Sequence, residues 1–69
     1  MTNTKLLELK IKESGKKKYY LAEKCGLSRA GFRNCIINQA EWTASQIDIL
    51  CEELEITSLR EKDAIFFAK

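Results

Sequence analysis

KYYLAEKCGLSRAGFRNCII, residues 18–37, is the stretch that decides the expected fold. Its pattern predicts one short helix over Lys18–Cys25, a turn at Gly26-Leu27 and a second helix entered through Ser28. The polar residues Arg29, Arg33 and Asn34 are left facing solvent. The apolar residues can all face inward; they are Leu21, Ala22, Cys25, Leu27, Phe32, Cys35 and Ile36. The stretch therefore predicts a rigid helix pair with a basic, amide-bearing outer face.

Three further helices are predicted around this pair. The first spans about Thr4–Ser14 and is stopped by Gly15, which suits the left-handed position after a helix. Two capping-box patterns, Thr43-Ala-Ser-Gln46 and Ser58-Leu-Arg-Glu61, open helices that run to about Leu54 and about Ala68. Asn38 is expected to end the helix before them in the left-handed conformation. With no proline and three glycines, the chain predicts an all-α fold of five helices.

The length of the chain predicts a single domain, and its charges are unevenly distributed along the sequence. The 69 residues allow one small domain, residues 1–69, with 45% hydrophobic and 32% charged residues, as in ordinary globular proteins. The net charge of +2 conceals an asymmetry, because residues 1–40 carry nine Lys/Arg against three Asp/Glu and residues 41–69 carry three against seven. One half of the molecule is thus expected to attract a polyanion and the other half to repel it.

Several functional classes are disfavoured by the residues that are missing. There is no histidine, and Cys25, Cys35 and Cys51 are too widely spaced for a zinc site, so free thiols packed as small hydrophobes are the better interpretation. No paired carboxylates or phosphate loop can be identified, so we expect no enzyme, no cofactor, no metal and no small-molecule substrate. No apolar run approaches the ~20 residues of a membrane span, and a reduced, cytoplasmic location is expected.

Two apolar features stand outside the helix pair. Trp42 precedes a predicted helix and is expected to plug the core rather than to bind a ligand. The triplet Ile65-Phe66-Phe67 is too apolar to be wholly exposed. It can pack into the core of the monomer or form a dimer interface, and the sequence does not choose between these. Leu59 and Phe66, one heptad apart, could share a face.

The helix pair resembles the helix-turn-helix of the phage Cro/CI repressor superfamily, the XRE type. The matching positions are Ala22, Gly26 and the apolar residues Leu21, Cys25, Leu27, Phe32 and Cys35. EWTASQIDILCEEL, residues 41–54, and the Ile65–Ala68 tail resemble short Firmicutes phage and prophage regulators. The resemblance covers nearly the whole chain. It departs from the family at Gly31, where a hydroxyl residue is frequent, and at Ile37-Asn38, where Asn-Gly is common.

The resemblance implies a phage-repressor-like domain in which the helix of about Ser28–Ile37 enters the major groove of operator DNA. Base contacts are implied for Arg29, Ala30, Arg33 and Asn34, and a phosphate contact for Lys18. Phosphate contacts are also expected for Lys16, Lys17, Ser28, Asn38 and Gln39. The run Lys16–Lys18 could gather its ammonium groups and backbone amides around one phosphate, or it could be a solvated basic turn. Side-chain chemistry agrees, because arginine can bond bidentately to guanine and asparagine to adenine. Which of Arg29 and Arg33 contacts a base stays open.

The expected function is therefore that of a Cro-like transcriptional repressor, acting as a homodimer on double-stranded operator DNA. The alternative is a helical protein–protein interaction module, antitoxin-like or a phage adaptor, that keeps the fold. The charge of the surface around residues 16–18 and 29–34 distinguishes these two functions. A positive face there favours DNA, and acidic side chains within it favour the adaptor.

Overall fold

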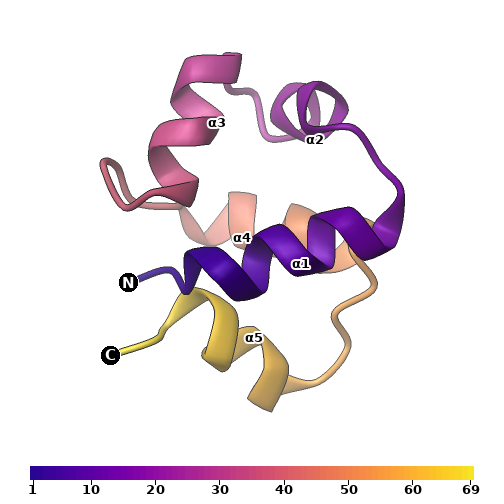
Figure 1. The fold of residues 1–69 in the computed structure, drawn as a ribbon, viewed down its shortest axis with the longest axis vertical. Helices are drawn as coiled ribbons and strands as arrows, with labels where there is room; N and C mark the ends of the chain where they lie inside the picture. The colour runs from indigo at the N-terminus through magenta and orange to yellow at the C-terminus, as the bar shows by residue number, and fades with distance from the viewer.

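The computed structural model describes all residues, 1–69, and contains five helices and no strand. It confirms the predicted all-α fold. The α2–α3 pair lies at one end of the molecule, α1 crosses the middle and α5 lies at the opposite end (Figure 1). None of the five helices has the length and apolarity that crossing a membrane requires. The helices are α1 (Thr4–Ser14), α2 (Lys18–Lys24), α3 (Arg29–Ile36), α4 (Ala44–Glu53) and α5 (Leu59–Phe66).

The helices begin where side chains can accept the first free backbone N–H groups. Asn3 caps α1 through the Leu6 N–H at 3.1 Å, and Ser28 caps α3 through the Gly31 N–H at 3.0 Å. The capping box predicted at Thr43 is complete: the Gln46 N–H donates to Thr43 Oγ1, and the Thr43 N–H donates to Gln46 Oε1. These caps act within four residues, which is why the sequence predicted the helix starts well.

The second predicted capping box forms only in part. Ser58 Oγ accepts from the Glu61 N–H at 3.4 Å, but the Glu61 side chain does not return to Ser58. Its carboxylate instead pairs with Lys10 of α1 at 3.0 Å. A charged partner from another helix thus replaces the local backbone donor. The helix is also shorter than predicted, because it ends at Phe66 and not near Ala68.

One core joins all five helices. Each helix contributes one large side chain with almost no exposed surface, and these are Leu7, Leu21, Phe32, Leu50 and Ile65. Trp42 packs edge-on against Phe32, with ring centroids 5.4 Å apart, and against Phe66 at 6.2 Å. The prediction that Trp42 belongs to the core is confirmed. These contacts bind α3 to α5 through the loop before α4.

The C-terminal triplet divides between core and surface. Ile65 and Phe66 are 0% and 4% exposed, whereas Phe67 is 54% exposed. The helix ends at Phe66, so Phe67 follows the last helical residue and lies outside the packed face of α5. Ile65 and Phe66 therefore belong to the monomer core and are not available as a dimer interface. Leu59, one heptad before Phe66 on α5, is 76% exposed, so it does not join Phe66 in the core.

The N-terminal residues tie the end of α3 to the end of α5. Asn38 has the predicted left-handed backbone, with φ of 65°. Its side chain accepts from the Thr2 N–H at 2.8 Å and donates to the Thr2 carbonyl at 3.0 Å. The Thr4 hydroxyl donates to the Ile36 carbonyl at 2.6 Å, and the Asn3 N–H donates to the Ile65 carbonyl at 2.7 Å. Residues 2–4 thus form a strap between the two helices.

Candidate functional site

The turn between α2 and α3 sets the position of the candidate site. Gly26 adopts φ of 71°, a left-handed conformation that a glycine takes at no steric cost. The N–H of Leu27 then donates to the Ala22 carbonyl at 2.9 Å and closes the turn. Leu21 and Ala22 from α2, with Phe32, Cys35 and Ile36 from α3, are buried. This anchoring turns the remaining side chains of α3 outward.

All four predicted base-contacting residues, Arg29, Ala30, Arg33 and Asn34, are exposed on α3. Arg29, Arg33 and Asn34 form no side-chain hydrogen bond and no ion pair within the molecule. Two guanidinium groups and one amide are thus free for an outside partner. Such groups are the donors and acceptors that recognise base edges and phosphates.

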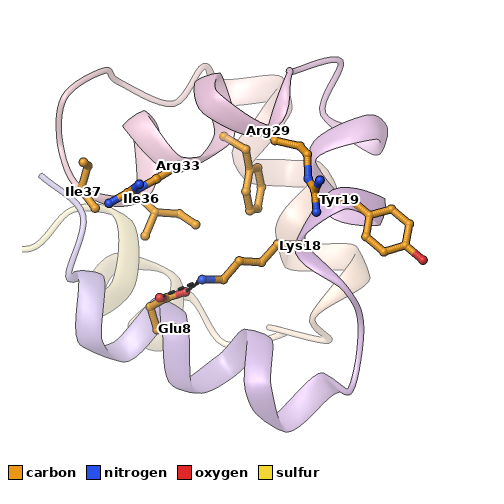
Figure 2. A pocket seen from close by; sticks show the side chains of 8 residues that line it. Glu8, Lys18, Tyr19, Arg29, Arg33, Ile36 and Ile37 are labelled. Carbon is orange, nitrogen blue, oxygen red and sulfur yellow. Dashed lines mark hydrogen bonds and ion pairs between the residues drawn. The ribbon is translucent and has the colours of Figure 1, made fainter.

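A groove of about 490 Å³ runs between α3 and the facing parts of α1 and α2. Figure 2 shows Arg29 and Arg33 on the α3 side of this groove and Lys18 with Glu8 across from them. Phe32 and Ile36 lie at its base, while Tyr19 and Ile37, 56% and 41% exposed, lie at its rim. The groove thus combines cationic edges with an apolar floor.

Lys18 lines the groove and forms an ion pair there with Glu8. Its ammonium lies 2.8 Å from Oε1 and 2.9 Å from Oε2 of Glu8 on α1. Glu8 Oε1 is buried by the surrounding protein atoms and accepts no hydrogen bond. The ion pair with the Lys18 ammonium is therefore its polar contact. An acidic side chain thus enters the basic face. Glu8 was not among the predicted site residues, because nothing local in α1 indicates that α2 will approach it.

Lys16 does not line this groove and instead contacts the end of α4. Its ammonium contacts the Glu53 carbonyl at 2.7 Å and Glu53 Oε1 at 3.1 Å, at the C-terminus of α4. Hydrogen bonds from Lys16 first, and from Tyr20 second, lower the pKa of Glu53 below its ordinary value. A cation at this helix end stabilises the free carbonyls. Of the predicted Lys16–Lys18 cluster, only Lys17 has no intramolecular ion pair.

The other predicted phosphate contacts differ in availability. Ser28 is exposed, but its hydroxyl oxygen already caps α3. Asn38 uses both ends of its amide on Thr2, so its side chain is not free for a phosphate in this structure. Gln39 is exposed and its side chain forms no hydrogen bond. The structure therefore leaves Lys17 and Gln39 as the freest members of the set.

Gly31 lies in the first turn of α3, below its cap. A Cβ at this position would lie 3.2 Å from Ser28 Oγ and 3.6 Å from Leu27 Cδ2. The three nearest atoms to that point all belong to Leu27 and Ser28, and none belongs to a neighbouring helix. The close contact is thus with the capping hydroxyl itself, which an added methyl group would have to displace slightly. Glycine leaves this cap undisturbed.

The three cysteines are free thiols on inward faces of the helices. Cys25 and Cys35 are buried and Cys51 is half-buried. Burial, followed by the neighbouring Cys35 and Glu53, raises the pKa of Cys25 to about 11. A thiol with a raised pKa stays protonated at neutral pH and is a poor nucleophile and metal ligand. No group of three or more potential metal ligands occurs in the structure.

Comparison with protein-family models found no match, and comparison with curated proteins and with solved structures found none either. The functional argument therefore depends on the residues of α3 and on the groove beside it.

Proposed function

We propose that this protein binds double-stranded DNA sequence-specifically, with α3 in the major groove, as a transcriptional regulator of phage or prophage type. The main support for this proposal is that Arg29, Arg33 and Asn34 are exposed on one short helix. Their side chains form no hydrogen bond or ion pair within the protein. The major groove admits one helix and presents the base edges that arginine and asparagine recognise.

The distribution of charge supports the same proposal. Residues 1–40 carry nine Lys/Arg against three Asp/Glu, and α2 and α3 belong to this half. The acidic excess lies in residues 41–69, which include α4 and α5. The α2–α3 pair and α5 occupy opposite ends of the molecule (Figure 1). A duplex approaching α3 would thus meet the basic half first.

The proposed active unit is a homodimer on a palindromic site, with half-sites about 34 Å apart. Because Ile65 and Phe66 are buried, Phe67 is the one member of the C-terminal triplet that could contribute to a dimer interface. Leu59, the first residue of α5, is also exposed. On this side of the molecule, a hydrophobic contact between two copies could use Leu59 and Phe67 but not the whole triplet.

A second candidate function is favoured by Glu8. A helical protein–protein interaction module would tolerate a carboxylate within the basic face, and Glu8 lies directly beside Lys18 in the groove. Two observations favour DNA over this alternative. The Glu8 charge is matched by Lys18, and both arginines across the groove remain unpaired.

Selection from random duplex pools at two salt concentrations tests the proposal. Recovery of a palindromic motif, with affinity that falls steeply as salt rises, is the expected result. Failure to enrich any motif at either salt concentration would reject sequence-specific binding and favour the interaction module.

Asn34→Ala should relax the preference at one base position and weaken binding to the selected site by about 1–3 kcal/mol. The reason is that alanine cannot form the two hydrogen bonds of an asparagine–adenine pair. Affinities for the selected site and for its single-base variants would measure the change. A loss of equal size on every sequence would show that Asn34 contacts no base.

Lys18→Ala should weaken binding to all sequences alike and reduce the slope of log K against log salt by at most about 0.9, which is the full contribution of one neutralised phosphate. A lysine that neutralises one phosphate releases about one counterion, and this contribution carries no sequence information. Titrations at several salt concentrations on the selected site and on a scrambled duplex would measure it. An unchanged slope would mean that Lys18 serves only as the partner of Glu8.

A further inference from the structure

Glu8 occupies a fixed position in the proposed DNA-binding face. It follows Leu7, which is fully buried, and Ile11 on the next turn of α1 is buried as well. These anchors hold α1 against the core and direct Glu8 to the edge of the helix that faces α2. Its carboxylate lines the same groove as Arg29 and Arg33. Its place is therefore determined by packing and does not depend on a flexible loop.

The ion pair between Glu8 and Lys18 competes with any phosphate for the lysine. Both carboxylate oxygens lie within 2.9 Å of the ammonium, so the Lys18 side chain is directed toward Glu8 in the free protein. The two side chains are 41% and 55% exposed, and ion pairs at such exposure contribute little net stability. A phosphate can therefore displace the carboxylate, but it then lies beside a negative charge that repels it.

We propose that Glu8 attenuates DNA binding by holding Lys18 in an ion pair, and so lowers the sequence-independent part of the affinity. This inference rests on the proposed function. Non-specific affinity comes from phosphate neutralisation, whereas base preference comes from contacts to base edges. Glu8 lies across the groove from the α3 side chains that would reach the bases. Its charge thus affects how tightly the protein binds any duplex, and leaves the preferred sequence unchanged.

Glu8→Gln tests this inference, because glutamine keeps the shape of the side chain and removes its charge. We expect affinity for the selected site and for a scrambled duplex to rise together, by about three-fold to ten-fold at low salt. The salt slope should steepen, since Lys18 becomes fully free to neutralise one phosphate, and the slope changes of Glu8→Gln and Lys18→Ala together should amount to about 0.9. Circular dichroism and thermal melting would establish that the variant folds like the original protein.

Glu13→Gln is the matched control. Glu13 lies on the same helix, is exposed and forms no ion pair, and its substitution changes the net charge equally. It lies outside the groove that Glu8 lines. An affinity gain in Glu13→Gln equal to that in Glu8→Gln would overturn the inference, because net charge alone would then explain both. A smaller gain supports it.

Glu8 could lower the affinity either by holding Lys18 away from the phosphates or by repelling the phosphates directly. The double variant Glu8→Gln/Lys18→Ala distinguishes these two effects. The inference predicts that its salt slope equals that of Lys18→Ala alone, since the added counterion release requires Lys18. A slope steeper than that of Lys18→Ala would contradict it, as would a Glu8→Gln effect confined to one base position. If neither the original protein nor Glu8→Gln binds any duplex, the proposed function fails, and the inference fails with it. Binding by both proteins with equal affinity overturns the inference alone.

Discussion

Phe32→Ala should destabilise the protein by about 3–5 kcal/mol, the largest effect expected from a single substitution here. Phe32 is 1% exposed, comes from the proposed recognition helix and packs edge-on against Trp42. Alanine would remove this aromatic contact and leave a cavity at the junction of α3 with the loop before α4. The free energy of unfolding from urea denaturation, followed by circular dichroism, would measure the loss.

Two further variants make this prediction testable even if Phe32→Ala does not fold. Phe32→Leu retains most of the buried volume and should cost about 1–2 kcal/mol. Phe67→Ala changes a phenylalanine that is 54% exposed and should alter stability by no more than about 0.5 kcal/mol. Equal losses in Phe67→Ala and Phe32→Ala would contradict the division of the aromatic residues into core and surface.

Asn38→Ala is expected to cost about 2–4 kcal/mol for two separate reasons. The variant loses both hydrogen bonds to the backbone of Thr2, a residue that is 7% exposed and so has little access to water. It also places alanine at φ of 65°, where a Cβ is crowded against the backbone. Thermal or urea unfolding would measure the change.

Asn38→Gly separates the two contributions. Glycine adopts the left-handed conformation without strain, so this variant should lose only the hydrogen bonds and be less destabilised than Asn38→Ala. Gln39→Ala is the control, because its exposed side chain forms no hydrogen bond, and it should remain within about 0.5 kcal/mol of the original protein. If Asn38→Ala were as stable as Gln39→Ala, the strap of residues 2–4 would not hold the end of α3.

The strap also explains why the departure at Ile37-Asn38 is compatible with a firmly held α3. The family resemblance implied a phosphate contact for Asn38. In the folded protein the chain terminus comes within hydrogen-bonding distance, and the amide of Asn38 binds Thr2 there. The residues involved are 36 positions apart, so no local pattern could have indicated this contact.

The local features of the fold were predictable because their causes lie within a few residues of one another. The starts of α3 and α4 depend on Ser28 and Thr43, whose side chains accept from backbone groups three residues later. The left-handed Gly15 and Asn38 follow from the conformations that these two residue types tolerate. The buried stripes follow from helical periodicity, and Phe32, Ile47 and Leu50 are buried as the pattern required.

The sequence by itself thus determined the five helices, the inward stripes and the exposed basic and amide side chains of α3. Tertiary structure alone decided which charges remain free, because ion pairs form between elements that the sequence does not place together. It brought Glu8 to Lys18 and Glu53 to Lys16, and left Arg29 and Arg33 unpaired. It also buried Ile65 and Phe66 while exposing Phe67, since the packing of α5 against the core covers the helix face of the first two and the helix ends before the third.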